Sequence, residues 1–106
     1  MEDKIKRIAA KYVKLYRGKG PQYVKVNINY EFIQVYSKGI LSTVGELLIK
    51  QGAFKLPEMA WNELRKEILD SFIDEVSKEI GKECSLVSER TDFYEDTRTI
   101  IIKLDS

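Results

Sequence analysis

The sequence predicts an α+β domain in which helices pack on one face of a four-stranded antiparallel sheet. Apolar residues recur at helical spacing in three segments, and they alternate with polar residues in four others. Glycine and proline fall between several of these segments, where they mark turns. The resulting order is α-β-β-α-α-β-β. A chain of 106 residues has the size of one domain, so we expect residues 1–106 to form a single folding unit.

The first helix is expected over residues 2–17. Apolar side chains follow one face of this segment, and basic side chains follow the opposite face. The helix should end at residues 18–21, with the sequence Gly-Lys-Gly-Pro, because glycine suits a left-handed C-terminal cap and proline cannot continue a helix. The apolar face consists of Ile5, Ile8, Ala9, Tyr12, Val13 and Tyr16.

The next two elements are predicted to be strands. Valine, isoleucine and tyrosine alternate with polar residues over residues 22–30, and a second strand is expected from Phe32 to Tyr36. A tight turn at residues 29–31 would join the two strands into an antiparallel hairpin. A similar hairpin is expected at the end of the chain, with strands over 83–91 and 97–104 joined by residues 92–96.

Two helices are predicted between the hairpins. Ser42 or Thr43 can cap the first, which should run to about Lys50, and Thr43 with Glu46 has the spacing of a capping box. Pro57 fits the first position of the other helix, since its missing N–H is not needed there. We expect this third helix to continue to Ile80.

The predicted third helix is long for a chain of this size. At 1.5 Å per residue it would measure roughly 36 Å. A compact domain of this length has a diameter near 30 Å, estimated from a radius of gyration of ~13 Å. The helix should therefore bend, protrude or lie across a partner subunit.

Composition argues against several classes of function. The chain has no histidine and one cysteine, Cys84, so it has no Ser-His or Cys-His nucleophile pair and no disulfide or structural zinc site within it. We expect no metal and no cofactor. A single cysteine fits a reducing compartment, no signal peptide is evident, and the apolar runs fall far short of the roughly 20 residues that span a bilayer. These features predict a cytoplasmic protein without membrane insertion.

Several segments together resemble one family, the MpsC-type domain family. They are the turn at 18–21, the sequence Gly-Ile-Leu-Ser-Thr at 39–43, the long acidic helix, and the isoleucine-rich final strand that ends at Leu104-Asp105. The family is named for its association with a bacterial system that generates membrane potential. The resemblance implies an accessory role near a membrane complex, and it supplies no catalytic residues. The chain departs from the family pattern at residues 41–45 and at Glu89-Arg90.

The basic face of the first helix is a candidate site for an anion, a nucleic acid or an anionic membrane surface. Basic residues exceed acidic ones in the first half of the chain, and the balance reverses in the second half. The alternative is an ordinary solvated helix face balanced by the acidic third helix. No known nucleic-acid-binding motif is present, so nucleic acid is the less favoured ligand. The candidate anion-binding residues are Lys4, Arg7, Lys11, Lys14, Arg17 and Lys19.

The apolar stripe of the third helix is a candidate interface with a second copy of the chain. The function that the sequence favours is a self-associating accessory or regulatory subunit, expected to be a homodimer and not an enzyme. The alternative is an anion- or nucleic-acid-binding module that uses the first helix. An enzyme using carboxylates or a metal near Glu89, Asp92, Glu95 and Asp96 ranks third. The candidate interface residues are Trp61, Leu64, Ile68 and Phe72.

Overall fold

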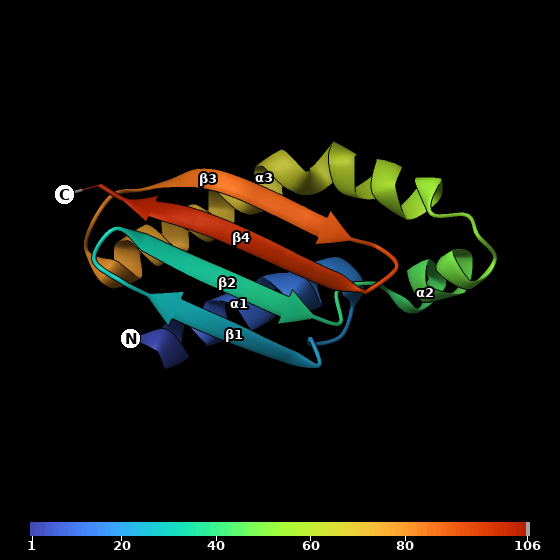
Figure 1. The fold of residues 1–106 in the computed structure, drawn as a ribbon, viewed down its shortest axis with the longest axis horizontal. Coiled ribbons are helices and arrows are strands. Elements are labelled where there is room, and N and C mark those ends of the chain that lie inside the picture. Colours follow the sequence, from blue (N-terminus) through green and yellow to red (C-terminus); the bar gives the residue numbers. More distant parts are fainter. Residues whose placement is uncertain (106) are drawn as a thin grey trace.

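The fold is described from a computed structural model covering residues 1–105, and it has the predicted element order (Figure 1). Three helices and one four-stranded antiparallel sheet confirm the α+β class. The chain order of the elements is α1 (Glu2–Arg17), β1 (Tyr23–Ile28), β2 (Phe32–Lys38), α2 (Thr43–Lys50), α3 (Lys55–Ile80), β3 (Cys84–Asp92) and β4 (Thr97–Leu104).

The four strands lie in the order β1-β2-β4-β3, and every neighbouring pair is antiparallel. The two hairpins therefore meet through β2 and β4, where Ile33 pairs with Ile102 and Val35 with Ile100. Figure 1 shows α1 and α3 behind the sheet, on the same face. This arrangement confirms the prediction that the helices cover one face. Helix α2 lies beyond the ends of the strands.

The core lies between this helical layer and the sheet. Side chains that alternate along β2 and β4 point toward the helices, because successive residues of a strand face opposite sides. They meet the apolar faces of α1 and of the second half of α3. The buried cluster consists of Ile5, Ala9, Val26, Ile33, Val35, Leu69, Phe72, Val76, Ile100 and Ile102.

The molecule is elongated, and this accommodates the long helix. Its dimensions are 45 × 22 × 19 Å. Helix α3 has 26 residues, which corresponds to about 39 Å. The second half of α3 covers the sheet, whereas its first half extends past the strand ends toward α2 (Figure 1). The predicted protrusion is thus present within a single chain, and no partner subunit is needed to explain the helix length.

Some element boundaries differ from the prediction. Helix α3 begins at Lys55, two residues before Pro57, and proline is tolerated there because N–H groups of the first helical turn have no acceptor within the helix. Strand β2 continues to Lys38. The cap of α2 is Ser42, whose Oγ accepts a hydrogen bond from the Gly45 N–H at 3.0 Å. Thr43 is already helical, so the predicted capping box of Thr43 and Glu46 does not form.

Of the helices in residues 1–105, none has both the length and the apolar character required to cross a bilayer.

Candidate functional site

The structure pairs most of the predicted basic face with carboxylates. Lys4 lies 3.2 Å from Glu79, and Lys11 lies 2.5 Å from Glu75, so α1 faces acidic side chains of α3 at both positions. The Tyr12 hydroxyl also donates to Glu75. Burial, together with this hydrogen bond, raises the pKa of Tyr12 to about 12. Much of the basic face is therefore balanced within the chain.

Two more of the predicted basic residues meet at the end of α1. Arg17 is buried, with 8% of its surface exposed, and its Nη1 donates to the Gly39 carbonyl. Its Nη2 lies 3.5 Å from Glu46, and Lys19 lies 3.2 Å from the same carboxylate. Arg17 thus ties α1 to the segment before α2. Arg7 and Lys14 stand on the exposed side of the helix.

The predicted interface residues of α3 divide between the interior and the surface. Trp61 and Phe72 are buried within the chain itself, so a second copy cannot reach them without disrupting the core. Ile68 is half-buried. Leu64, with 45% of its surface exposed, is the most accessible of the four. The helical period correctly places these residues on one side of α3, but most of that side is covered by the same chain.

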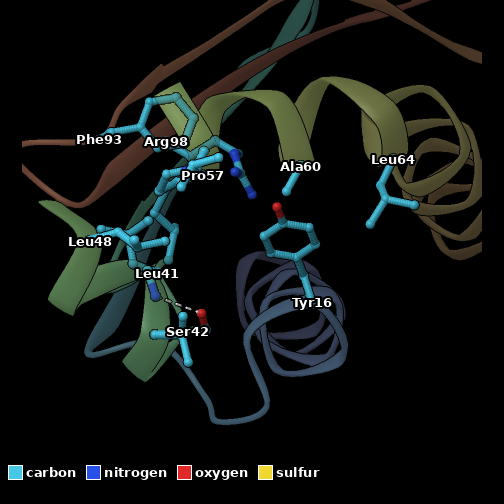
Figure 2. Close-up of a pocket in the computed structure, with 13 residues that line it drawn as sticks. Tyr16, Leu41, Ser42, Leu48, Pro57, Ala60, Leu64, Phe93 and Arg98 are labelled. Atoms are coloured by element: carbon cyan, nitrogen blue, oxygen red, sulfur yellow. Dashed lines mark hydrogen bonds between the residues drawn. The ribbon is translucent and has the colours of Figure 1, made fainter. Parts of the chain in front are cut away.

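A pocket opens where α3 extends past the sheet (Figure 2). Its volume is about 330 Å³, and its walls come from the end of α1, the segment before α2, α2 itself and the start of α3. Four leucine side chains from three of these segments line it. Figure 2 shows Tyr16 on one side of the pocket and the side chains of Leu41 and Leu48 on the other. The leucines are Leu41, Leu48, Leu56 and Leu64.

A buried guanidinium reaches this apolar pocket from the sheet. Arg98 lies on β4 in phase with Ile100 and Ile102, so it points toward the helices as they do. Only 6% of its surface is exposed. Its guanidinium carbon lies 3.4 Å from the centroid of the Trp61 ring, and its Nε donates to the Thr91 hydroxyl at 2.9 Å. Figure 2 shows its nitrogen atoms near the Tyr16 hydroxyl.

A carboxylate lies behind Arg98, and other donors already occupy it. Glu89 accepts hydrogen bonds from Trp61 Nε1 at 3.2 Å and from Arg65 Nε at 3.0 Å, and the Thr91 hydroxyl also donates to it. Burial by itself would raise the pKa of Glu89. The bonds from Thr91, Trp61 and Arg65 outweigh this effect and hold that pKa below its ordinary value. Glu89 is therefore a stable anion whose contact with Arg98 runs through Thr91.

One nitrogen of Arg98 has no protein partner. The buried Nη2 atom finds no hydrogen-bond acceptor within residues 1–105. Burial lowers the pKa of Arg98 to about 10, against the attraction of Glu89, Tyr16 and Asp96, so the guanidinium stays charged at neutral pH. Burial also raises the pKa of Tyr16, which keeps its hydroxyl protonated. The site thus offers two hydrogen-bond donors and a positive charge in an apolar setting.

The wall next to α2 is fixed by the loop between β3 and β4. Asp96 adopts a left-handed conformation with φ of 60°, and its carboxylate accepts from the backbone N–H groups of Ile40 and Leu41 at 2.7 and 2.8 Å. Its carbonyl accepts from the Gly39 N–H at 2.8 Å. These three bonds hold the segment leading into α2 beside the sheet.

The acidic residues of the last hairpin do not gather into one group. Asp92 accepts from the backbone of the turn, Asp96 accepts from residues 40 and 41, and Glu89 faces the helices. No cluster of three potential metal ligands occurs in the part of the chain described, residues 1–105.

The sequence interpretation did not identify Arg98 as a site residue. Its position in the alternating strand was the available signal, because residues 98, 100 and 102 share one face. Glu89 was harder to place. An irregularity in the pairing between Leu86 and Ser88 shifts the register of β3, so simple alternation along that strand is interrupted before Glu89.

Comparison with known proteins identifies a family for the whole chain. Residues 1–106 match the model of the family described as "Na⁺-translocating membrane potential-generating system (MpsC)". The chain therefore belongs to the MpsC family, as the resemblance indicated. No curated protein matches it, and no solved structure matches it.

Proposed function

We propose that this MpsC-family chain is a non-catalytic, cytoplasmic accessory subunit that regulates a membrane-potential-generating system by binding an anionic ligand in the pocket between its helices. The family description supports the link to such a system. The pocket supplies the place for a ligand. Binding at this site, rather than on the basic face of α1, is favoured because carboxylates already pair with Lys4 and Lys11.

The observation that carries the proposal is Arg98, a residue of the pocket lining whose buried Nη2 has no acceptor within residues 1–105. A buried charge without full hydrogen bonding destabilises the fold, because it has lost the hydration it would have in water. Glu89 does not supply the missing acceptor, since its oxygens already receive bonds from Trp61, Arg65 and Thr91. An anionic ligand would supply it, and the low local dielectric would strengthen the interaction.

A binding role is also favoured over catalysis by the chemistry of the pocket. The chain contains no histidine, and the carboxylate nearest to Arg98 is held ionised by three donors. A group fixed in this way is poorly suited to exchange a proton with a substrate. The pocket is instead rich in leucine, with few polar side chains to orient a ligand, as in many binding sites.

The proposal is tested by screening small fragments of positive, neutral and negative charge against the ¹⁵N-labelled chain. We expect anionic fragments to shift the amide signals of Tyr16, Leu48 and Ala60, which line the pocket. Arg98→Met should remove these shifts, whereas Arg90→Met should retain them. Arg90 is the matched control because it is exposed and pairs with Thr99 on the face of the sheet away from the helices. Shifts confined to other surfaces, or none, would contradict the proposal.

Self-association is the second part of the proposed function, and exposed apolar side chains favour it. Five of them lie on α2 and the first half of α3, and three of these five line the pocket. A second copy covering them would remove this apolar surface from water, which is favourable. We therefore propose a homodimer that uses this end of the molecule. The side chains are Val44, Leu47, Leu56, Met59 and Leu64.

The dimer is tested by sedimentation equilibrium at high micromolar concentration. We expect a mass of twice the 12.3 kDa of one chain. The double variant Leu56→Gln, Met59→Gln should shift the mass toward one chain. Leu15→Gln should not, because Leu15 is at least as exposed but lies on α1. A single-chain mass for the unmodified protein would exclude the dimer and leave the ligand proposal standing.

A further inference from the structure

We propose that the ligand of this pocket is a small amphiphilic monocarboxylate, whose carboxylate binds the Arg98 guanidinium and the Tyr16 hydroxyl while its apolar tail lies among the leucines. The inference rests on the proposed ligand-binding function and specifies its chemistry. It depends on three features of the site: the number of donors, the charge of the buried cluster, and the size and polarity of the walls.

The donors fit a carboxylate better than a phosphate. Arg98 has its Nε engaged by Thr91 and its face covered by Trp61, which leaves Nη2 as the buried donor without a partner. Tyr16 offers one hydroxyl nearby (Figure 2). A carboxylate can place one oxygen on each donor. A phosphate would bring further oxygens against leucine side chains, where they would lose hydration without replacement.

The charges around Arg98 favour the binding of one more anion. Glu89 is directly paired with Arg65, a partly exposed arginine, at 3.0 Å, so the buried charge of Arg98 has no directly paired anion. Asp96 lies near enough to attract Arg98, but its carboxylate is directed at the backbone of Ile40 and Leu41. A singly charged ligand would neutralise the cluster. A cation would be repelled, and a neutral group would leave the charge of Arg98 uncompensated.

The remaining walls suit a short apolar tail. Apart from Arg98 and Tyr16, the polar side chain in the lining is Ser42, which serves as the cap of α2. A volume of about 330 Å³ is small for a ligand pocket. At about 30 Å³ for each non-hydrogen atom of a liquid such as water, it holds about 11 such atoms. Octanoate, with about ten, has this size. Its tail would end beside Leu56 and Leu64, which are partly exposed at the mouth.

The experiment measures the affinity of octanoate for the full chain by NMR titration and calorimetry. Octanamide, a neutral isostere, and octyl phosphate are the comparison ligands. We expect octanoate to bind at least about tenfold more tightly than octanamide, because a hydrogen bond between two charged groups is strong when desolvated. Octyl phosphate should bind more weakly than octanoate. Acetate, which has the head group without the tail, should bind at least about tenfold more weakly, because its single methyl group buries little apolar surface.

Variants of the chain locate the two parts of the ligand. Arg98→Met should weaken octanoate by at least about tenfold and bring it close to octanamide. Tyr16→Phe should weaken it by a smaller factor, because one neutral donor is lost. Ala60→Phe places an aromatic ring in the pocket from an exposed position of α3, so it should block octanoate binding. This variant provides an independent test if Arg98→Met fails to fold. Arg90→Met should bind octanoate as the unmodified chain does.

The outcomes separate this inference from the proposed function. If octanamide binds as tightly as octanoate, or if octyl phosphate binds more tightly, the monocarboxylate assignment is wrong. If anionic fragments occupy the pocket but octanoate does not, the assignment is again wrong, while the ligand-binding function remains. If no anionic fragment and no octyl compound shifts the pocket residues, both proposals are overturned.

Discussion

The two ends of this elongated molecule use their apolar residues differently. At the sheet end, α1 and the second half of α3 bury aliphatic and aromatic side chains against four strands. At the helical end, α2 and the first half of α3 leave leucines partly exposed around a pocket, and an arginine is buried there instead. The first arrangement is what stability requires. The second leaves apolar surface in water and a charge incompletely bonded, and the proposed binding role rests on these two features.

The boundary between the two ends lies at Trp61. Its ring contacts the Arg98 guanidinium at 3.4 Å and the Tyr16 ring edge-to-face with centroids 5.3 Å apart. Its Nε1 donates to Glu89. One aromatic side chain therefore closes the aliphatic core on one side and supports the polar cluster on the other. The comparison can be tested by substitutions at each end, and the largest effects are expected in the core.

Truncation of the core should have the largest effect on stability. Phe72 is almost fully buried beneath the sheet, so Phe72→Ala should lower the free energy of unfolding by about 3–5 kcal/mol. Leu64→Ala is the matched change on the same helix at the other end. Because Leu64 is already 45% exposed, its truncation should cost about 1 kcal/mol or less. Urea denaturation followed by circular dichroism measures both, and equal losses would refute the contrast between the ends.

The junction between the two ends should be the next most sensitive point. Gly39 has φ of 85°, and a Cβ there would lie 2.6 Å from Arg17 Nη1 and 2.8 Å from the Gln22 backbone nitrogen. Gly39→Ala should therefore cost on the order of 3 kcal/mol, since left-handed strain and overcrowding add. Gly52→Ala is the control, because Gly52 has φ of 78° but open space around it.

Gly52→Ala should cost only the conformational strain, about 1–2 kcal/mol. The same denaturation curves give both values. Similar losses for the two variants would mean that the approach of Arg17 and Gln22 to Gly39 does not constrain the junction.

The polar cluster formed by Glu89 and its hydrogen-bond donors should contribute less to the free energy of unfolding, and its contribution should depend on pH. Glu89→Gln removes the charge that receives bonds from Trp61, Arg65 and Thr91, at an expected cost of about 1–3 kcal/mol near pH 7. Because folding lowers the pKa of Glu89, its contribution is complete above the ordinary value of about 4.5 and is lost as pH falls through the folded value.

The difference in unfolding free energy between the unmodified chain and Glu89→Gln should therefore shrink as pH is lowered below about 4.5. Urea curves at several pH values measure it. Taking the difference between the two chains removes the effect of Glu75, whose pKa is also lowered, through its bonds to Lys11 and Tyr12. A difference that stays constant down to strongly acidic pH would exclude this account of Glu89.

The sequence predicts the sheet end well, because local periodicity determines it. Alternation places Ile33, Val35, Ile100 and Ile102 on one face, and the helical period of α1 supplies the surface that covers them. The helical end is less predictable, because the same period does not say which neighbour covers a residue. Trp61 and Leu64 belong to one stripe, yet the chain's own Arg98 covers the first and solvent reaches the second.

The pattern of charges in the sequence is limited in the same way, because it does not show which charges pair within the fold. The basic residues of α1 are evident from the sequence, but the carboxylates that neutralise Lys4 and Lys11 lie more than 60 residues away on α3. The sequence pattern predicts that Arg17 belongs to the same anion-binding face, whereas in the structure it is a buried link to Gly39. The ion pairs depend on how α1 and α3 pack together, which is a tertiary property. A pattern of charges therefore indicates a polar face, and only the fold shows which charges remain available.

The smallest effect on stability is expected for the arginine that we assign to the ligand. Arg17 and Arg98 are both buried, with 8% and 6% of their surfaces exposed. Arg17→Met would leave the Gly39 carbonyl without its donor, and Glu46 without one of its cations, so it should cost about 1.5–3 kcal/mol, although the buried Nε of Arg17 also has no acceptor within residues 1–105. Arg98→Met would lose the bond to Thr91 and the contact with Trp61, but it would also remove a buried charge whose Nη2 is unpartnered.

These opposing contributions are similar in size, so we expect Arg98→Met to change the free energy of unfolding by less than about 1 kcal/mol in the absence of ligand. Adding octanoate should then raise the thermal midpoint of the unmodified chain and of Arg17→Met, but not that of Arg98→Met, because a ligand stabilises only a chain that binds it. Differential scanning calorimetry measures both quantities. If Arg98→Met cost more than Arg17→Met, the guanidinium of Arg98 would be a structural link, and the unpartnered nitrogen would no longer argue for a ligand.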